Sequence, residues 1–167
     1  MKKILLAVLL IVASLFTGAY SEVLVEGGVA LNDEMVMVEY ECEYYSAEEV
    51  ALYLHAFRVL PVNYITKKTA QSEKWKSGSD LWDYAYGCVI GGDRFGNYEG
   101  QLPDKKGREW YECDVNYEGG HRGAERLLFS TDGLIYYTPD HYVTFELLYE
   151  GWYADGIYGE VYIDENS

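Results

Sequence analysis

Four side chains between residues 107 and 146 have the chemistry needed for acid–base catalysis. They are a carboxylate, Glu112, two guanidinium groups, Arg122 and Arg126, and an imidazole, His141. A carboxylate can take a proton from a nucleophile, an imidazole can give one to a leaving group, and fixed cations stabilise an anionic transition state. Taken singly, Glu112 is more typical of a solvated strand residue and His141 of a turn, so the fold must decide whether they act together.

The same stretch has the pattern of an antiparallel meander. Apolar and polar residues alternate over residues 109–116, 125–130 and 133–138, as they do in half-buried strands. A Gly-Gly pair at 119–120 and the sequence TDG at 131–133 are typical of the turns between such strands. We therefore expect one face of a sheet to carry the base, the two cations and the acid.

The residues before the meander predict a strand and then a helix. Strict alternation over residues 34–45 is typical of a strand. Ser46, with Glu49 three positions later, forms a capping box, which begins a helix that ends before the Leu-Pro pair at 60–61. The apolar stripe expected on this helix is Val50, Tyr53, Leu54 and Phe57. His55 on the same helix is predicted to be a surface or half-buried residue and not a ligand.

A second helix is expected over residues 67–75, capped by Thr66, and a short third one over residues 80–86. A lysine in the first turn of a helix opposes the helix dipole. Lys67 is therefore either simply solvated there or placed for the charge of a ligand. Residues 89–95 predict a strand with a bulge at its two glycines.

The 167 residues fit one domain with an extension at each end. Residues 1–19 combine two lysines, an apolar run and small residues at a cleavage site, which predicts a signal peptide and export; the run is short for a membrane anchor. We then expect an acidic N-terminal extension (20–45), a central domain (46–148) and an acidic, aromatic C-terminal tail (149–167). Alternating aromatic residues over 149–163 predict a hairpin in that tail.

The net charge of −15 is concentrated at the two ends of the chain. Residues 20–45 contain seven acidic residues and no basic one, and residues 147–167 contain five and none. An acidic chain is a poor non-specific binder of nucleic acid, because affinity for the backbone comes from lysine and arginine. The remaining bases are grouped near the candidate site. The acidic ends fit two roles, either shielding that site from anions or keeping an exported protein soluble.

Three cysteines, Cys42, Cys88 and Cys113, allow at most one internal disulfide, and three buried thiols are an equal alternative. Their spacings match no metal motif and the three histidines are scattered, so a zinc site is not expected. We predict a protein without a metal or other cofactor.

Several long segments resemble the small secreted guanyl-preferring ribonucleases of bacilli, the barnase family of the microbial ribonuclease N1/T1 superfamily. The segments are LPVNYITKKTA, IGGDRFGNYEGQLP, GREWYECDVNY, RGAERLLFS and GLIYYTPDHYVTF. The resemblance extends over residues 46–147. It implies an α+β fold in which three N-terminal helices pack on a five-stranded antiparallel sheet, with the open face of the sheet as the groove for RNA.

The resemblance also implies roles for individual residues. It makes Glu112 the general base and His141 the general acid. The cations expected to bind phosphate are Lys67, Arg122 and Arg126, with Tyr142 as a neighbour that also touches phosphate. The loop expected to recognise guanine contains Asn97, Tyr98 and Glu99. The acidic residues expected to hold the cations in place are Asp93 and Asp114, and the expected structural ion pair is Arg108 with Asp132.

Two residues of the guanine loop depart from the family pattern. Tyr98 stands where the family has an arginine, and Gly96 where it has a serine. Glu99 is kept and can accept from the N1 and N2 hydrogens of guanine, while Tyr98 offers a ring that can stack on the base. We therefore expect a preference for guanine by a smaller margin than in the family. The acidic ends have no counterpart in the family pattern, and the family's usual basic character is missing.

The sequence thus predicts a secreted, metal-independent endoribonuclease that cleaves single-stranded RNA after guanine, through a 2′,3′-cyclic phosphate to a 3′-phosphate. Such cleavage needs a base for the 2′-hydroxyl, an acid for the departing 5′-oxygen and cations for the extra negative charge. By resemblance, its partners are RNA and a barstar-like inhibitor, and it is expected to be a monomer. The alternative is a degenerate ribonuclease scaffold that acts as a secreted binding module. A secreted toxin would share the chemistry of the enzyme.

Overall fold

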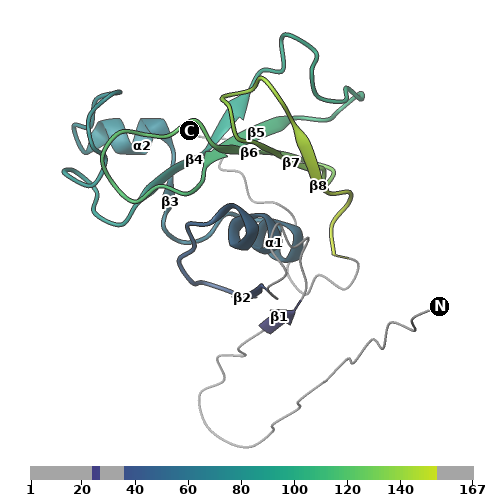
Figure 1. The fold of residues 1–167 in the computed structure, drawn as a ribbon, viewed down its shortest axis with the longest axis horizontal. Coiled ribbons are helices and arrows are strands. Elements are labelled where there is room, and N and C mark those ends of the chain that lie inside the picture. Colours follow the sequence, from purple (N-terminus) through teal and green to yellow (C-terminus); the bar gives the residue numbers. More distant parts are fainter. Residues whose placement is uncertain (1–23, 27–35, 154–167) are drawn as a thin grey trace, which may run out of the picture.

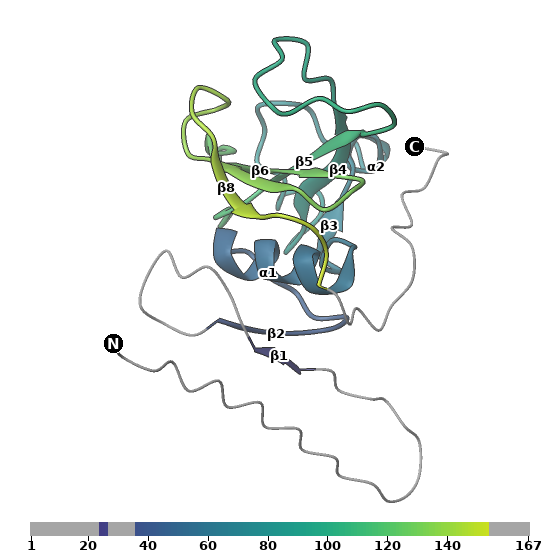
Figure 2. The ribbon, with the colours of Figure 1, turned by 90° about the vertical axis from the view of Figure 1, so that its right-hand side faces the viewer.

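The computed structural model describes residues 24–26 and 36–153, which have an α+β fold. A six-stranded sheet forms one layer, and helix α1 (Ala47–Phe57) covers one of its faces (Figure 1). Strands β1 (Leu24–Glu26) and β2 (Met37–Glu39) lie on the other side of α1, so that the helix is enclosed between the sheet and this pair of strands (Figure 2).

The sheet has the strand order β3-β4-β5-β6-β7-β8. Its strands are β3 (Tyr64–Ile65), β4 (Val89–Phe95), β5 (Trp110–Asp114), β6 (Arg126–Ser130), β7 (Ile135–Thr138) and β8 (Glu146–Tyr149). Strands β4 to β8 pair antiparallel, which confirms the predicted meander in β5, β6 and β7. The sheet as a whole differs from the predicted five antiparallel strands, because β3 adds a sixth strand that pairs parallel with β4. The N–H of Val89 donates to the carbonyl of Asn63 (2.9 Å), which fixes this short pairing.

Alternation along β5 gives the sheet two different faces. Tyr111 and Cys113 point toward α1 and share a core cluster with Val50 and Leu54 of that helix. Glu112, between them in sequence, therefore lies on the opposite, open face. One face of the sheet is thus used for packing, and the other is left for the candidate site.

Helix α1 begins and ends where the sequence predicts. The hydroxyl of Ser46 accepts the N–H of Glu49 (3.3 Å), and the carboxylate of Glu49 accepts the N–H of Ser46 (3.4 Å), which completes the capping box. After Phe57, Arg58 takes a left-handed conformation (φ +62°) and caps the helix. The predicted apolar stripe is buried and consists of Val50, Tyr53, Leu54 and Phe57.

Helix α2 (Lys67–Ser72) begins at its predicted cap but is shorter than predicted. The hydroxyl of Thr66 accepts the N–H of Thr69 at 3.2 Å. Beyond the helix, Lys74 has a positive φ of +70°, and Trp75 turns into a small core in which it is 3% exposed. Burial of the indole therefore ends α2 before residue 75.

Residues 80–86 form turns and not the short helix that the sequence predicts. The carbonyl of Leu81 accepts from the N–H groups of Tyr84 and Ala85, which makes a single turn. The indole of Trp82 donates to the carbonyl of Cys88 (2.9 Å), which bends the chain back. A single turn does not extend into a helix, because nucleation fixes the backbone of several residues and gains only one hydrogen bond. The described residues thus contain two helices instead of three, and neither is long and apolar enough to cross a bilayer.

The predicted strand over residues 34–45 is shorter in the structure, and residues 34–35 lie outside the described part. Strand β2 pairs antiparallel with β1 and ends at residue 39. The chain then turns, and Glu41 has a positive φ of +62°. The N–H of Glu41 donates to the hydroxyl of Tyr53 on α1 (3.1 Å). This bond to α1 turns the chain where the alternating pattern predicts that the strand continues.

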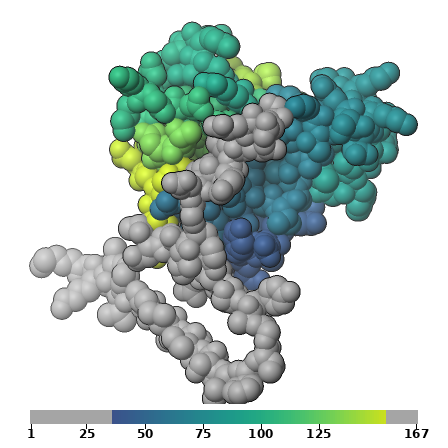
Figure 3. Space-filling model, turned by 180° about the vertical axis from the view of Figure 1, so that it is seen from behind, coloured from purple at the N-terminus to yellow at the C-terminus, as the bar shows by residue number. Residues whose placement is uncertain are grey.

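The described part of the acidic N-terminal extension packs on α1, away from the sheet. Val38 is fully buried in a cluster with Leu52, Ala56 and Phe57 of that helix. Figure 2 shows β1 and β2 on one side of α1 and the sheet on the other, and Figure 3 shows most of the green residues above the dark blue ones when the molecule is seen from behind. The described acidic strands therefore do not shield the face that carries Glu112.

Strand β8 forms an edge of the sheet and leads into a turn that is anchored on α1. The Nδ1 atom of His55 lies 3.0 Å from the carbonyl oxygen of Gly151, and its ring stacks on Tyr149 at 4.3 Å between centroids. His55 is partly buried, in agreement with the prediction, and burial lowers the pKa of its imidazole. The predicted signal peptide (1–19) lies outside the described residues, and so does the predicted tail hairpin from residue 154 onward.

The three cysteines are free thiols and form no disulfide. Cys113 is 1% exposed in the core between the sheet and α1, and burial raises the pKa of its thiol well above the ordinary value. Cys42 and Cys88 are partly exposed. Of the two alternatives that the sequence leaves open, the structure has three thiols, of which one is fully buried.

We predict that Val38→Ala lowers the free energy of unfolding by about 2 kcal/mol, because it removes buried methyl groups and leaves a cavity against α1. Urea unfolding of the full chain measures this change. Val62→Ala is the matched control, since Val62 is 56% exposed and its truncation should change the free energy by less than about 0.5 kcal/mol. Equal effects of the two substitutions would show that β2 is not part of the packed fold.

Candidate active site

Glu112 is held on the open face of the sheet by two side chains. Lys67 Nζ donates to its Oε1 at 2.6 Å, and the hydroxyl of Tyr142 donates to its Oε2 at 2.6 Å. Lys67 comes from the first turn of α2, and Tyr142 comes from the loop after β7. The side chain of Glu112 is 12% exposed and that of Lys67 is 37% exposed. Lys67 is thus not simply solvated but paired with a carboxylate of the protein, and its placement for the charge of a ligand stays a prediction.

The ionisation of Glu112 is set by two opposing effects. Burial disfavours the charged carboxylate and acts to raise its pKa. The hydrogen bonds from Lys67 and Tyr142, and the positive charges of Lys67 and Arg126, act in the opposite direction and outweigh burial. The pKa of Glu112 is therefore below its ordinary value. The carboxylate is ionised at neutral pH, which is the state that a general base needs.

Asp93 fixes the start of α2 beside Glu112. Its Oδ2 accepts the backbone N–H of Lys67 at 2.9 Å, and it is the register partner of Glu112 across β4 and β5. Strand β4 has a register shift between Gly91 and Asp93, where the sequence predicts a bulge. Burial raises the pKa of Asp93, and the charge of Glu112 adds to this, against the bond and charge of Lys67. Asp93 thus directs Lys67 toward Glu112.

Two arginines converge on one buried carboxylate. Asp114 is 3% exposed, Arg122 Nη2 donates to its Oδ1 at 2.7 Å, and Arg126 Nε forms an ion pair with the same oxygen at 2.8 Å. Arg126 also donates from Nη1 to the carbonyls of Gly123 and Glu125. Burial acts to lower the pKa of Arg122, but the bonded carboxylate outweighs it and raises that pKa. Both guanidinium groups are therefore fixed in direction by Asp114.

A hollow of about 390 Å³ lies between these arginines and His141. Its walls include Arg122, Arg126, His121, His141 and the loop at 77–79. Two guanidinium groups and two imidazoles on the walls suit an anion such as a phosphate, because planar guanidinium groups bind its oxygens in pairs.

His141 is placed by a backbone that is strained but well bonded. His141 and Tyr142 both have positive φ, +58° and +72°, which is uncommon for residues with side chains. The N–H of His141 donates to the carbonyl of Ala124 (3.2 Å), and that of Tyr142 to the hydroxyl of Thr138 (2.9 Å). The carboxylate of Asp140 accepts the N–H groups of residues 143 and 144. Strain of this kind persists where the surroundings fix a side chain in one direction.

The loop expected to recognise guanine is closed by Asn97. Its Nδ2 donates to the carbonyl of Leu102 (2.9 Å), and its Oδ1 accepts the N–H of the same residue (3.0 Å). The side chain of Asn97 therefore shapes the loop. Tyr98, which is 99% exposed, and Glu99 lie at the exposed tip.

The structure brings the predicted residues together in three groups. Lys67, Glu112, Tyr142 and Asp93 form one; Arg122, Arg126, Asp114 and His141 form the second; Asn97, Tyr98 and Glu99 form the third. The charge of Arg126 acts on Glu112 and links the first two. Phe95 links the third to the first, because its ring stacks on that of Tyr142 at 5.3 Å. The expected ion pair is also formed, with Arg108 Nε 2.7 Å from Asp132.

Sequence reasoning missed three residues of this site. His121 lines the hollow, but the sequence analysis gives it no role, because the three histidines are scattered along the chain. Its position next to Arg122 is the signal that indicates this role. Thr138 and Asp140 hold the loop of His141, and the sequence TPDH is a signal for them, because Thr and Asp side chains typically bind the backbone of a turn.

The arrangement can take a proton on one side and give one on the other. Glu112 is an ionised carboxylate, His141 is an exposed imidazole, and three cations lie around them. In the part of the chain that the structure describes, no three His, Cys, Asp or Glu side chains gather in a group suited to a metal ion. An ionised carboxylate, an imidazole and three cations in this arrangement suit acid–base chemistry on an anionic ester.

Comparison with known proteins gives the family. The family model described as ribonuclease matches residues 47–149, and the chain belongs to this ribonuclease family. Over 97 residues, which are 58% of the chain, it is 52% identical to a ribonuclease of Heyndrickxia coagulans, and the match covers 89% of that protein. It is also 52% identical over 97 residues to the ribonucleases of Bacillus intermedius and Bacillus pumilus, and covers 60% of each. The resemblance inferred from the sequence motifs is confirmed.

We predict that Lys67→Ala raises the pKa of Glu112, because the substitution removes its closest cation. The acidic limb of the pH dependence of kcat/KM on RNA should then move to higher pH, and kcat/KM at neutral pH should fall about 100-fold. Lys68→Ala is the control, since Lys68 is an exposed neighbour on the same helix. An acidic limb that stays in place would mean that Lys67 does not keep Glu112 ionised.

Proposed function

We propose that this protein is an exported endoribonuclease that cleaves single-stranded RNA without a metal, preferentially after guanine. One observation carries the proposal: Glu112, ionised and held by Lys67 and Tyr142, lies on the same sheet as a hollow lined by two arginines and His141. These are the base, the cations and the acid that cleavage at a ribose 2′-hydroxyl requires.

The reaction proceeds in two steps. In the first, Glu112 takes the proton of the 2′-hydroxyl, and the 2′-oxygen attacks the adjacent phosphorus. The bond from phosphorus to the 5′-oxygen breaks, and His141 gives that oxygen a proton. In the second step, His141 takes a proton from water, which attacks the 2′,3′-cyclic phosphate, and Glu112 returns its proton to the 2′-oxygen. The products are a 3′-phosphate and a 5′-hydroxyl.

The cations serve the phosphate between these two groups. Arg122 and Arg126 are oriented by Asp114, so they need little rearrangement to meet phosphate oxygens. Lys67 forms an ion pair with Glu112. When Glu112 takes the proton of the 2′-hydroxyl, the ammonium group of Lys67 can contact the phosphate, where negative charge develops. Tyr142 also lies beside this path, since its hydroxyl is bonded to the same carboxylate.

Base preference is assigned to the loop that Asn97 closes. Glu99, exposed at its tip, accepts from the N1 and N2 hydrogens of guanine, and Tyr98 offers a flat ring for stacking. The family arginine is replaced by Tyr98, so the loop has one cation fewer. The preference for guanine is therefore smaller than in the family.

The proposal extends to the setting of the enzyme. The composition of residues 1–19 supports export. An exported ribonuclease endangers the cell that makes it, and we propose a barstar-like protein inhibitor that covers the cationic hollow. We also propose, from the resemblance to the family, that the enzyme acts as a monomer.

Cleavage of single-stranded RNA in the presence of EDTA tests this function. We expect products that end first in a 2′,3′-cyclic phosphate and then in a 3′-phosphate. Glu112→Ala and His141→Ala should each lower kcat/KM by about 10²–10⁴-fold with little change in thermal unfolding. Glu146→Ala, an exposed carboxylate on β8, is the control and should cleave at the unchanged rate. Loss of cleavage in EDTA, or retained activity in both site variants, would contradict the mechanism.

The base preference has its own measurement. The values of kcat/KM on the dinucleotides GpN, ApN, CpN and UpN should be highest for GpN. Glu99→Gln should lower the GpN value about tenfold relative to the other three, because the amide cannot accept both guanine hydrogens. Glu118→Gln, an exposed carboxylate outside the loop, is the control. Equal values for all four dinucleotides in the unchanged protein would show that Glu99 does not read the base.

A further inference from the structure

The hollow between Arg122, Arg126 and His141 contains a second imidazole, that of His121, which takes no part in the proposed proton transfers. Among the described residues that line the hollow there is no carboxylate. The wall at residues 77–79 adds two serines, whose hydroxyl groups are neutral hydrogen-bond donors. The lining of the hollow is therefore suited to an anion on every side.

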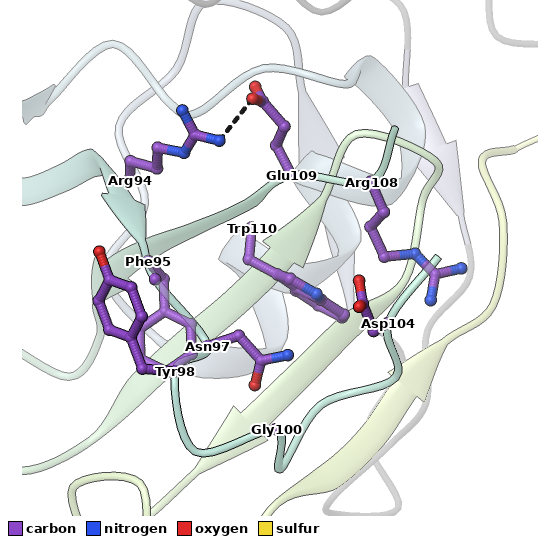
Figure 4. Close-up of a pocket in the computed structure, with 10 residues that line it drawn as sticks. Arg94, Phe95, Asn97, Tyr98, Gly100, Asp104, Arg108, Glu109 and Trp110 are labelled. Carbon is purple, nitrogen blue, oxygen red and sulfur yellow. Dashed lines mark ion pairs between the residues drawn. The ribbon is translucent and has the colours of Figure 1, made fainter. Parts of the chain in front are cut away.

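The pocket inside the loop between β4 and β5, of about 410 Å³, differs from the hollow in charge. Figure 4 shows Arg94 and Glu109 directed at one another on its wall, where they form an ion pair at 2.7 Å. Arg108 of the same pocket forms an ion pair with Asp132 (2.7 Å), and Asp104 adds a negative charge to the lining. An anion is therefore expected in the hollow and not in this pocket.

The permanent charge of the hollow is small. Arg122 and Arg126 share the carboxylate of Asp114, which leaves one net positive charge among these three groups. Each imidazole that becomes protonated adds one more charge, and histidine is the side chain whose charge changes between about pH 5 and 8. The attraction of the hollow for a phosphate thus depends strongly on its two histidines, and it is greatest at the acidic end of this range.

His121 is held at the hollow by an anchored turn. Tyr117 is 4% exposed, and its hydroxyl lies 3.1 Å from the carbonyl oxygen of Gly120 and 2.8 Å from Oδ1 of Asp80. The same hydroxyl accepts the N–H of Leu81 at 3.0 Å. The backbone beside His121 is therefore tied to the residues that follow the wall at 77–79, while the residue itself is exposed.

The charged and titratable groups that line the hollow with His121, or flank its walls, come from four segments of the chain: Lys76, Asp80, Glu118, Arg122, Arg126 and His141. Of the carboxylates, Asp80 interacts with His121. The hydrogen bonds from Trp82 and Tyr117 lower the pKa of Asp80, and the positive charge of His121 lowers it further. Asp80 thus gives a protonated His121 a counter-charge outside the lining of the hollow.

We propose that His121, in its protonated form, binds a phosphate of the RNA and makes the affinity for RNA greatest at mildly acidic pH. The inference rests on the proposed ribonuclease function, which supplies the anion. Arg122 and Arg126 offer their charge to the phosphate throughout this range, whereas His121 adds its charge only when the imidazole is protonated. His141 gives its proton to the leaving oxygen, but His121 keeps its proton and holds the substrate. The added attraction is therefore complete at acidic pH and is lost as the pH rises.

Binding of a single-stranded deoxyribotetranucleotide to the full chain tests this contact. The probe lacks the 2′-hydroxyl and is not cleaved, and its phosphodiesters keep their charge throughout the range. We expect His121→Gln to weaken binding about fivefold near pH 5, as the loss of one exposed ion pair would, and to change it little near pH 8. His55→Gln, which removes the imidazole on α1, is the control and should bind like the unchanged protein. Equal weakening by His121→Gln at both pH values, or no weakening, overturns the proposal.

A second variant supplies a permanent charge at the same position. His121→Arg should bind the deoxyribotetranucleotide about fivefold more tightly than the unchanged protein near pH 8, because the guanidinium group is charged where the imidazole is not. Near pH 5 the two proteins should bind alike. The pH dependence that comes from His141 remains in every variant, so the difference between variants reports position 121. Unchanged affinity of His121→Arg near pH 8 contradicts the role of charge at this position.

Cleavage of RNA separates this inference from the proposed function. Near pH 5, His121→Gln should raise KM about fivefold and lower kcat by less than about twofold, because proton transfer is assigned to Glu112 and His141. A fall in kcat of about 100-fold would make His121 a proton donor and overturn its role in binding. A preparation that binds the deoxyribotetranucleotide through His121 but does not cleave RNA supports the contact and contradicts the proposed function. Cleavage with equal KM in the unchanged protein and His121→Gln at every pH contradicts the inference alone.

Discussion

Asp114 is almost fully buried, and its carboxylate contacts two guanidinium groups at once. Burial of an isolated carboxylate is costly, and the cost is offset where charged partners surround it. Arg122 and Arg126 are these partners, and the hydroxyl of Tyr64 donates to the backbone carbonyl of the same residue (2.9 Å). Without Asp114, two partly buried cations of the site would lose the carboxylate that they contact directly. The cationic side of the site therefore depends on this one carboxylate.

The two faces of β5 explain how a single strand serves both stability and chemistry. Its odd-numbered residues, Tyr111 and Cys113, pack on α1, and α1 is covered in turn by β2 through Val38. Glu112 and Asp114 alternate with these residues, so their carboxylates lie on the other face of the sheet. Strand β2, which precedes the family match, thus adds packing through Val38 on the side of α1 that faces away from the sheet.

Much of this arrangement follows from the sequence. The predictions that are wrong, for the ends of α2 and β2 and for residues 80–86, have a common cause. The meander follows from alternation, and α1 follows from the contact between Ser46 and Glu49, which are local signals. The end of α2 and the turns at 80–86 depend on where the indoles of Trp75 and Trp82 are buried, and β2 ends because Tyr53 on α1 binds the backbone that follows it. These contacts join residues that no local pattern connects. Tertiary contacts therefore override the local pattern at each of these positions.

The acidic character of the protein makes the proposed chemistry depend on local charge. Three cations, Lys67, Arg122 and Arg126, face three carboxylates, Glu112, Asp93 and Asp114, so the site has no large excess of positive charge to attract RNA. In the proposed first step, the proton of the 2′-hydroxyl neutralises Glu112 while the phosphate gains negative charge. Lys67 then loses its carboxylate partner at the moment when an anion forms beside it. The cations therefore stabilise the transition state more than the bound substrate, which is the difference that accelerates a reaction.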